Sequence, residues 1–356
     1  MLLYNKYIFE VNNNMKQDKT FFAQIITFIF TIIFIGSLTA KADIKVVTTI
    51  KPLHSLVSNV MDGVGEPSLI IEGGSSPHSF VLKPSHAKLI EKADIIFWIG
   101  EDIETFMEKP LDSIAKNAKK ISFMELNSID KLKFREENIF EHEDHDEHGH
   151  DEDKDHDEDK DHDEHKHDED KDHDEDKDHE EHGHEGHHHG EYDAHIWLDP
   201  LNAKIMLHEI AHELSDLDPD NADKYNKNAD ETITAIDKMV NNINKNTNKN
   251  AKFVVFHDAY QYFEKRFGFH TAGALTINPD VLPGAKQISE IQEVITEKDI
   301  KCIFSEPQFN PKIIETIAQD TGIKTGVLDP LGSVFEANKS QYFKLINDLA
   351  EKLKGC

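Results

Sequence analysis

Short apolar runs alternate with amphipathic stretches along most of the chain, which is the pattern of βαβ units. Several runs are almost continuous in Val, Ile and Phe, as expected for parallel strands buried on both faces. Helices fit between the runs, including one over 84–92 that opens with Pro84 and one over 200–217 that Asp199 caps. The pattern predicts eight strands, at residues 44–49, 68–71, 94–100, 120–124, 252–257, 272–276, 301–305 and 324–328.

The stretch 219–248 differs from the other helical segments in its length. A helix of about 30 residues spans roughly 45 Å, which is too long for an ordinary crossover inside one α/β unit. It also separates the first four predicted strands from the last four. Apolar residues recur in it at the spacings of three and four that mark a helix with one buried face: Tyr225, Ala229, Ile233, Ile236, Val240 and Ile243.

These patterns predict an α/β fold of two lobes, each a parallel sheet with flanking helices, joined by one long helix. We expect the N-terminal lobe over 43–217, the linking helix over 218–249 and the C-terminal lobe over 250–356.

One segment holds most of the charge of this 356-residue chain, whose formal net charge is −30. Residues 141–190 contain 26 Asp and Glu, 15 His, 5 Lys and 4 Gly, and carry −21. Without apolar residues the segment cannot offset the entropy of ordering, so we expect a disordered insertion in the N-terminal lobe. It is either a plain solvated charge run or, as we favour, a tract whose imidazoles and carboxylates collect Zn²⁺ and similar ions in weak sites.

The rest of the chain has the composition of an ordinary folded protein, about 44% apolar. It carries a net charge of only −9 and has no strongly basic stretch outside the N-terminal leader. Because nothing there would neutralise a phosphate backbone, nucleic acid is excluded as an expected partner.

The first 42 residues resemble an export signal. Lys16 and Lys19 give a positive start, an apolar run follows over 21–38, and Ala40-Lys41-Ala42 offers a cleavage site. Residues 1–14 then precede the typical start at Met15. The run is also long enough for an uncleaved membrane anchor, but we favour cleavage near Ala42 and a periplasmic protein.

The chain has two cysteines, Cys302 and Cys356. In an exported protein such a pair suggests one disulfide. Two unrelated thiols are the alternative, although a bond that holds the last helix explains a cysteine at the end of the chain better.

Three histidines stand at ends of apolar segments: His78 just past a strand, His195 where the tract re-enters the fold, and His257 at the end of strand 252–257. Asp329 follows the last predicted strand in the same way. Ligands of open α/β sheets bind outside the carboxyl ends of the strands. Three imidazoles and one carboxylate suit tetrahedral Zn²⁺, so we expect a zinc site with two ligands from each lobe.

Residues 43–356 contain a series of motifs whose residues and order along the chain resemble those of the periplasmic zinc-binding proteins of ABC uptake systems. These proteins belong to the cluster of metal-binding receptors that also includes manganese proteins. The motifs are Lys51-Pro-Leu-His-Ser-Leu-Val57, Pro77-His-Ser-Phe80, Lys83-Pro-Ser85, Ala93-Asp-Ile-Ile-Phe-Trp-Ile-Gly100, His195-Ile-Trp-Leu-Asp-Pro200, Phe256-His-Asp-Ala-Tyr260, Phe304-Ser-Glu-Pro-Gln-Phe309 and Leu328-Asp-Pro-Leu-Gly332.

This resemblance implies a rigid linking helix, His78, His195 and His257 as zinc ligands, and a Cys302–Cys356 disulfide. It implies zinc as the transported ligand and, as partners, a membrane permease with its cytoplasmic ATPase; we expect a monomer with no enzymatic activity. The manganese branch carries Glu where this chain has His257. Some zinc members place an acidic residue where this chain has Pro77, which leaves the fourth ligand open between Asp329 and water.

Two other classes of function compete with transport. His208-Glu209-Ile-Ala-His212 matches the H-E-x-x-H motif of zinc hydrolases, in which Glu is the general base. However, the helix ends within about five residues of His212, and no third histidine ligand follows at the expected spacing. A metal-storage or buffering protein acting through the His-rich tract is the second alternative, but it would not need two lobes.

Overall fold

The computed structural model describes residues 44–140, 190–247, 249–279 and 281–356. Residues 45–356 form one compact unit. Its first sheet is parallel and four-stranded, with the order β2-β1-β3-β4. Its elements are β1 (Val46–Thr48), α2 (Lys51–Val60), β2 (Ser68–Leu69), α3 (Pro84–Lys92), β3 (Ile95–Trp98), α4 (Glu108–Ser113) and β4 (Lys119–Ser122), with 3₁₀ turns at Thr105–Met107 and Phe123–Glu125.

The second sheet repeats this topology with the order β6-β5-β7-β8, again all parallel. Helices α8 and α9 cover one face of it, where their buried Ile and Val side chains pack against apolar residues of β5, β6 and β7. Its elements are β5 (Lys252–His257), α7 (Gln261–Phe267), β6 (His270–Thr276), α8 (Ala285–Glu297), β7 (Cys302–Ser305), α9 (Lys312–Thr321), β8 (Lys324–Val327) and α10 (Gln341–Lys354).

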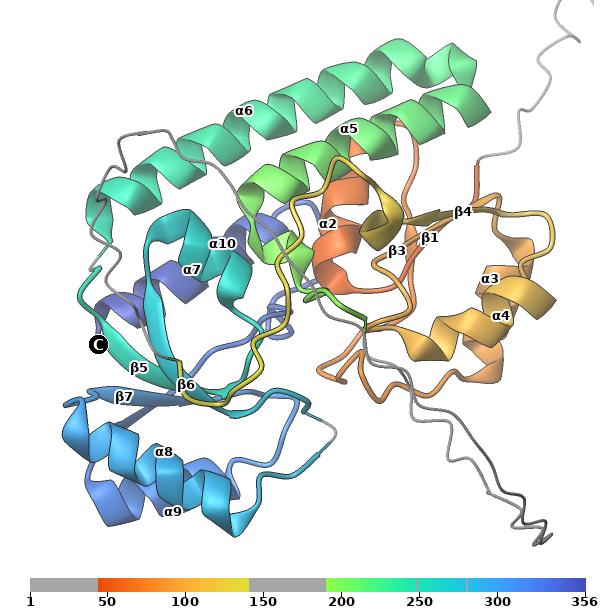
Figure 1. Ribbon diagram of the computed structural model, residues 1–356. Coiled ribbons are helices and arrows are strands. Elements are labelled where there is room, and N and C mark those ends of the chain that lie inside the picture. The colour runs from red at the N-terminus through yellow and green to blue at the C-terminus, as the bar shows by residue number, and fades with distance from the viewer. Residues whose placement is uncertain (1–43, 141–189, 248, 280) are drawn as a thin grey trace, which may run out of the picture. The chain divides into compact units, whose positions relative to one another are not determined.

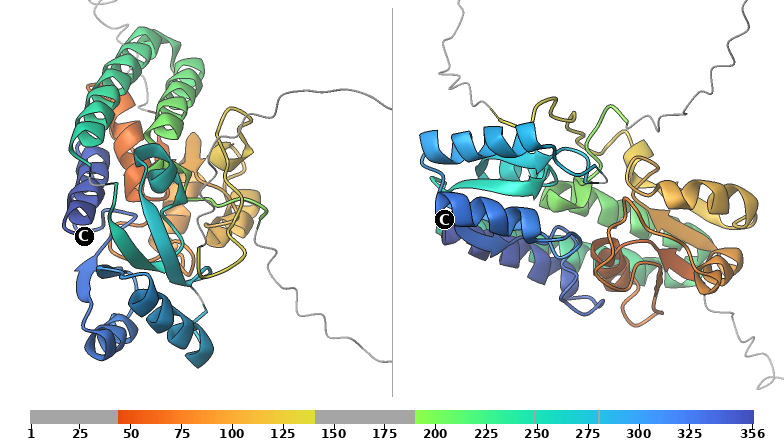
Figure 2. Two further views of the ribbon diagram at one scale, coloured as in Figure 1. Left: turned by 60° about the vertical axis from the view of Figure 1, so that its left-hand side comes forward. Right: turned by 90° about the horizontal axis from the view of Figure 1, so that it is seen from below.

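Two helices lie between the sheets in the sequence and side by side in space: α5 (Pro200–Leu217) and α6 (Ala222–Asn246) (Figures 1 and 2). The buried Asp199 caps α5 by accepting a hydrogen bond from the backbone N–H of Leu201. Helix α6 contacts α2 beside the first sheet and α10 beside the second. Its buried face holds Tyr225, Ala229, Thr232, Ile236, Met239 and Ile243.

A segment that leaves the first sheet runs across to the second one, and we call residues 132–140 the strap (Figure 1). Its end pairs with the free edge of β6: Ile139 forms an antiparallel bridge with Gly273, and Phe140 N–H donates to the carbonyl of Ala272. The side chain of Ile139 packs against the core under that sheet. The strap therefore gives the second sheet a short antiparallel addition at its edge.

The predicted α/β fold is confirmed: two parallel four-stranded sheets with flanking helices and one long helix. All eight predicted strands are present, with ends shifted by at most two residues. The long helix is shorter than predicted, because a 3₁₀ turn occupies Pro219–Asn221 and α6 begins at Ala222. The division into lobes at 217 and 249 stays a prediction.

The disulfide is confirmed: Cys302 at the start of β7 is bonded to Cys356, which follows α10. The leader and the His-rich tract lie outside the described residues, except for Gly190 at the end of the tract. In the part of the chain that is described, no helix has both the length and the apolar character that a bilayer crossing needs.

Candidate metal site

Three predicted ligands come together where the two sheets face each other. His78 lies on the loop between β2 and α3, His195 precedes a 3₁₀ turn over Ile196–Leu198, and His257 is the last residue of β5. Within the described residues they are the one group of three or more potential metal ligands, with ligand atoms all within 4.8 Å of one another. His195 and His257 are buried and His78 is half-buried, so the site opens to solvent beside the His78 loop.

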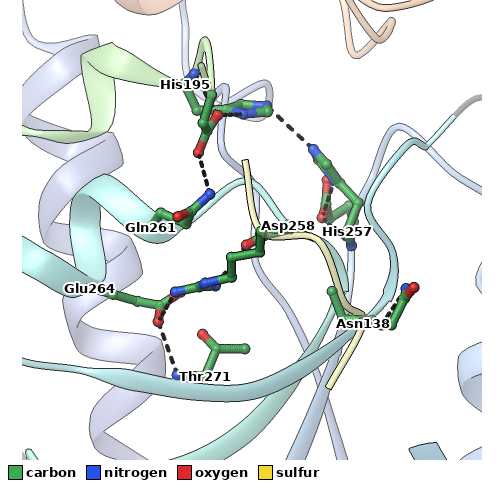
Figure 3. Close-up of polar contacts among 11 residues, drawn as sticks. Asn138, His195, His257, Asp258, Gln261, Glu264 and Thr271 are labelled. Carbon is green, nitrogen blue, oxygen red and sulfur yellow. Dashed lines mark hydrogen bonds and ion pairs between the residues drawn. The ribbon is translucent and has the colours of Figure 1, made fainter. Parts of the chain in front are cut away.

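His195 is held by a carboxylate that sequence analysis did not select. Asp193 Oδ1 accepts hydrogen bonds from the backbone N–H of His195 at 3.0 Å and from its ring Nδ1 at 2.7 Å. The second oxygen of Asp193 accepts from Gln261 on α7 (Figure 3). Because Nδ1 donates to the carboxylate, the lone pair is left on Nε2, which faces the cavity.

His257 is held in the same way by Glu306, the residue that follows β7. Strands β5 and β7 are paired so that Val255 lies beside Phe304. When this register is continued by two residues, His257 lies beside Glu306. The ring Nδ1 of His257 lies 2.7 Å from Glu306 Oε1. Both carboxylates therefore fix the tautomer that presents Nε2, an arrangement typical of zinc-binding histidines.

The two Nε2 atoms of His195 and His257 lie 3.3 Å apart (Figure 3). The ring of His78 completes the group, with its centroid 5.5 Å from that of His195 and 5.7 Å from that of His257. The cavity that the rings help to line has a volume of about 10 Å³, which is room for one water-sized particle. Its walls are Ser76, Pro77, Trp197, Gln308, Phe309, Pro330 and Leu331 besides the histidines and Glu306.

The structure does not bring Asp329 into the histidine group. Its carboxylate is engaged by its own loop and by the loop after β7. Oδ2 accepts from the backbone N–H and the hydroxyl of Ser333, and Oδ1 accepts from the N–H of Leu331 and from the side-chain amide of Gln308. Lys51 from α2 donates to the carbonyls of Ser333 and Phe335 and so holds the same loop from the other side.

Buried charges surround the site. Burial alone would lower the pKa of His257, but the charge and hydrogen bond of Glu306 outweigh it and raise that pKa. Burial also raises the pKa of Asp258 to about 8, although Arg135 from the strap opposes the shift. Arg135 donates to Asp258 at 2.8 Å and to Glu264 at 3.0 Å, and this pairing fixes the turn directly after His257.

Sequence analysis missed Asp193 and Glu306, although both stand within or next to the motifs that carry the family resemblance. The signal that could have found Glu306 is its place after the strand that neighbours the strand of His257. The histidines of the H-E-x-x-H match, His208 and His212, are exposed on α5 and belong to no ligand group among the described residues. The hydrolase alternative therefore has no supporting site there.

Comparisons with known proteins agree with this geometry. The zinc-uptake protein ZnuA of Brucella abortus is 46% identical over 325 residues, which cover 91% of this chain and 94% of that protein. The ZnuA protein of Haemophilus influenzae is 39% identical, covering 88% and 93%. A crystal structure of ZnuA shares the fold, with a TM-score of 0.64 at 20% identity over 88% of this chain and 100% of that one. The family model described as zinc-uptake complex component A, periplasmic, matches residues 46–356, and the chain belongs to this family of binding proteins, which are not enzymes.

Proposed function

We propose that His78, His195 and His257 hold, through their ring nitrogens, the zinc ion that this member of the periplasmic zinc-uptake family captures for import. Zinc is here the transported ligand of a high-affinity ABC uptake system, whose permease and ATPase are the partners. Asp329 or a water molecule supplies the fourth ligand. If Asp329 does so, its loop must give up hydrogen bonds from Ser333 or Gln308.

The separation of 3.3 Å between the Nε2 atoms of His195 and His257 carries this proposal. In a tetrahedral site with Zn–N bonds of about 2.0–2.1 Å, two nitrogen ligands lie about 3.3–3.4 Å apart. Because Nδ1 of each ring donates to a carboxylate, both Nε2 atoms present lone pairs to each other. Such an arrangement is repulsive unless a cation or a proton lies between them.

The geometry also favours zinc over harder ions. Three imidazoles suit Zn²⁺, whereas Mn²⁺ prefers more carboxylate oxygen. Glu306 and Asp193 are committed to the Nδ1 atoms of His257 and His195, so neither is free to serve as an oxygen ligand without releasing its histidine.

Single substitutions of His78, His195 or His257 by Ala test the ligand set. We expect each to weaken zinc binding by at least about a hundredfold, because removal of one of three imidazoles leaves an incomplete site. Competition titration against a zinc chelator measures the change, and His208→Ala on the exposed face of α5 is the matched control. Unchanged zinc affinity in His257→Ala, measured without residues 142–189, would overturn the assignment.

We also propose that the chain is exported with cleavage near Ala42 and acts as a monomer. The family's periplasmic location supports export, and mass spectrometry of the protein recovered from the periplasm gives the position of cleavage. The His-rich tract would collect ions beside the site in weaker sites, since it returns to the fold only five residues before His195.

A further inference from the structure

Asp329 stands beside the wall of the three-histidine cavity, but its carboxylate is not part of the ligand group. The two residues that follow it, Pro330 and Leu331, line the cavity. The carboxylate is buried and accepts hydrogen bonds from Leu331, Ser333 and Gln308. The cavity is thus bordered by an oxygen ligand that neighbouring donors hold back.

A lysine from the helix beside the first sheet holds the loop of Asp329. Lys51, the first residue of α2, is 7% exposed, and its Nζ donates to the carbonyls of Ser333 at 2.6 Å and Phe335 at 3.0 Å. A buried ammonium group needs such acceptors, because it has lost most of its water. Ser333 is therefore fixed by Lys51 through its carbonyl, while its N–H and hydroxyl engage Asp329.

Lys51 and Asp329 also interact through their charges. Burial lowers the pKa of Lys51, and the negative charge of Asp329 opposes this shift. The ammonium attracts the carboxylate where it stands. The charge of Lys51 and the hydrogen bonds of Ser333 therefore both favour the position that Asp329 has in its loop.

The joint between α2 and the segment before α10 does not depend on Lys51. The hydroxyl of Ser55 and the amide of Asn59 both donate to the carbonyl of Lys339, at 3.1 and 2.8 Å. The Ser55 hydroxyl also accepts from the N–H of Tyr342. Because these neutral contacts already join the two segments, and because burying a charge adds little stability, the joint alone does not explain the ammonium of Lys51.

We propose that Lys51 determines the metal specificity of the three-histidine site by keeping Asp329 in its loop, an inference that rests on the proposed function. With Asp329 held back, the ion meets three imidazole nitrogens and a water molecule, a ligand set that suits Zn²⁺. A released Asp329 would add a carboxylate oxygen, which favours harder ions such as Mn²⁺. Lys51 acts through Ser333 and Asp329, so it is a positioning residue.

The test compares the zinc and manganese affinities of the full mature chain by competition titration against chelators. Lys51→Met removes the ammonium and keeps a long, unbranched side chain. We expect the ratio of zinc affinity to manganese affinity to fall about tenfold, because the freed carboxylate can reach the ion. Lys339→Met is the matched control: its ammonium pairs with Asp62 across the same joint but at the surface, and its ratio should equal that of the parent.

Two further variants show whether Lys51 acts through Asp329. Ser333→Ala removes one donor to Asp329 and should shift the ratio in the same direction as Lys51→Met. When Asp329→Ala is already present, adding Lys51→Met should leave the ratio unchanged, since no carboxylate remains to be released. A general loosening of the structure would shift the ratio with or without Asp329.

A folded Lys51→Met variant with the parent's ratio overturns the inference, and so does a shift of equal size in the presence and absence of Asp329. Thermal unfolding shows whether the variant folds; if it does not, Ser333→Ala decides, and the parent's ratio in that variant overturns the inference. None of these results affects the proposed function. A parent chain that binds no zinc, or binds it equally well after His257→Ala, refutes the proposed function instead.

Discussion

Among single residues, Glu306 decides which nitrogen of His257 faces the cavity. Its carboxylate can only accept the proton of Nδ1, and so leaves Nε2 free for the ion. In Glu306→Gln the amide can donate to Nδ1 instead, which would move the ring proton to Nε2 and block it. We expect zinc affinity to fall by about 10- to 100-fold, as it does when partners of metal-bound histidines are removed.

Chelator competition measures this change, and Glu293→Gln on the exposed face of α8 is the control. Thermal unfolding of the metal-free proteins separates the effect from a loss of stability. Equal zinc affinity in Glu306→Gln and the parent would show that the Glu306 carboxylate does not select the tautomer.

A second buried carboxyl group belongs to Glu104, which precedes the 3₁₀ turn Thr105–Met107 and contacts the backbone just after β3. It is fully buried and accepts a hydrogen bond from Ile99 N–H at 2.7 Å. Burial raises its pKa from 4.5 to about 7, although Thr49 and the N–H groups of Ile99 and Gly100 oppose the shift. In the folded protein Glu104 therefore keeps its proton up to a pH at which the unfolded chain has already lost it.

A raised carboxyl pKa stabilises the folded state at low pH and loses this effect as the pH rises. We expect the free energy of unfolding to decline between pH 4.5 and 7, by at most about 1.4 kcal/mol per pH unit from this group. Glu104→Gln, which stays neutral, should remove this part of the decline and be more stable than the parent at pH 8. Urea unfolding from pH 5 to 8 measures it, with the exposed Glu101→Gln as control; parallel curves for Glu104→Gln and the parent would contradict the expectation.

At the scale of elements, the apolar runs were enough to predict the sheets. Strands such as β3 and β5 are buried on both faces, so their sequences are nearly continuous in apolar residues and need no tertiary information to be recognised. The start of α6 was placed three residues too early. Pro219 fits the first turn of an α-helix and that of a 3₁₀ turn equally well. The sequence therefore does not show that Pro219–Asn221 form a separate 3₁₀ turn between α5 and α6.

The strap could not be predicted, because its conformation depends on pairing with the edge strand β6, which lies more than 130 residues later in the sequence. Residues 138–140 show no strand pattern of their own, and they become extended because β6 offers unpaired N–H and C=O groups. Asn138 illustrates this: its carbonyl accepts from Ala274 N–H and its side-chain amide donates to the carbonyl of Ala274.

Arg135 should hold the strap against the second sheet. It compensates Asp258 and Glu264, which are 1% and 5% exposed, and it stacks on Phe140 with its guanidinium 4.0 Å from the ring. Removing Arg135 leaves the buried carboxylate of Glu264 without compensation, so we expect Arg135→Ala to lower the free energy of unfolding by roughly 3 kcal/mol. Urea unfolding of the metal-free protein measures this loss.

Lys133→Ala is the matched control within the strap, because its ion pair with Glu191 is exposed to solvent and should contribute little to the free energy of unfolding. Adding Asp258→Asn and Glu264→Gln to Arg135→Ala should recover part of the loss. Equal stabilities of Arg135→Ala and Lys133→Ala would mean that the buried pairing does not secure the strap.

At the scale of the whole molecule, sequence analysis selected the residues of the site better than their surroundings. The three histidines end apolar segments, and topology brings the carboxyl ends of parallel strands to one edge. Asp329 stands at an equivalent position, yet its side chain is held by Ser333 within its own turn. Whether a strand-end carboxylate faces the cavity or caps a loop depends on the hydrogen-bond donors beside it. Periodicity carries no information about those donors.

The charge of the whole chain predicts how zinc reaches the site. The tract at 141–190 accounts for −21 of the net charge of −30 and is joined to the fold beside the site, through Tyr192, which is bridged to Lys133, and Asp193. All three histidine ligands lie outside it. A strong negative field raises the local concentration of a cation and its association rate, and salt screens this effect beyond about 8 Å at 0.15 M ionic strength.

Deleting residues 142–189 should therefore leave one tightly bound zinc ion per protein with unchanged dissociation rate, while the association rate becomes slower and less dependent on salt. Stopped-flow mixing of the apo protein with zinc at 0.02 to 0.5 M salt measures the rates, and native mass spectrometry counts the ions. The tract's own sites should be weaker, because a chain that has to order around each ion loses entropy that the preformed cavity does not. Loss of the tight ion on deletion would instead place part of the primary site in the tract, whereas parallel salt dependences would show that its charge does not steer zinc.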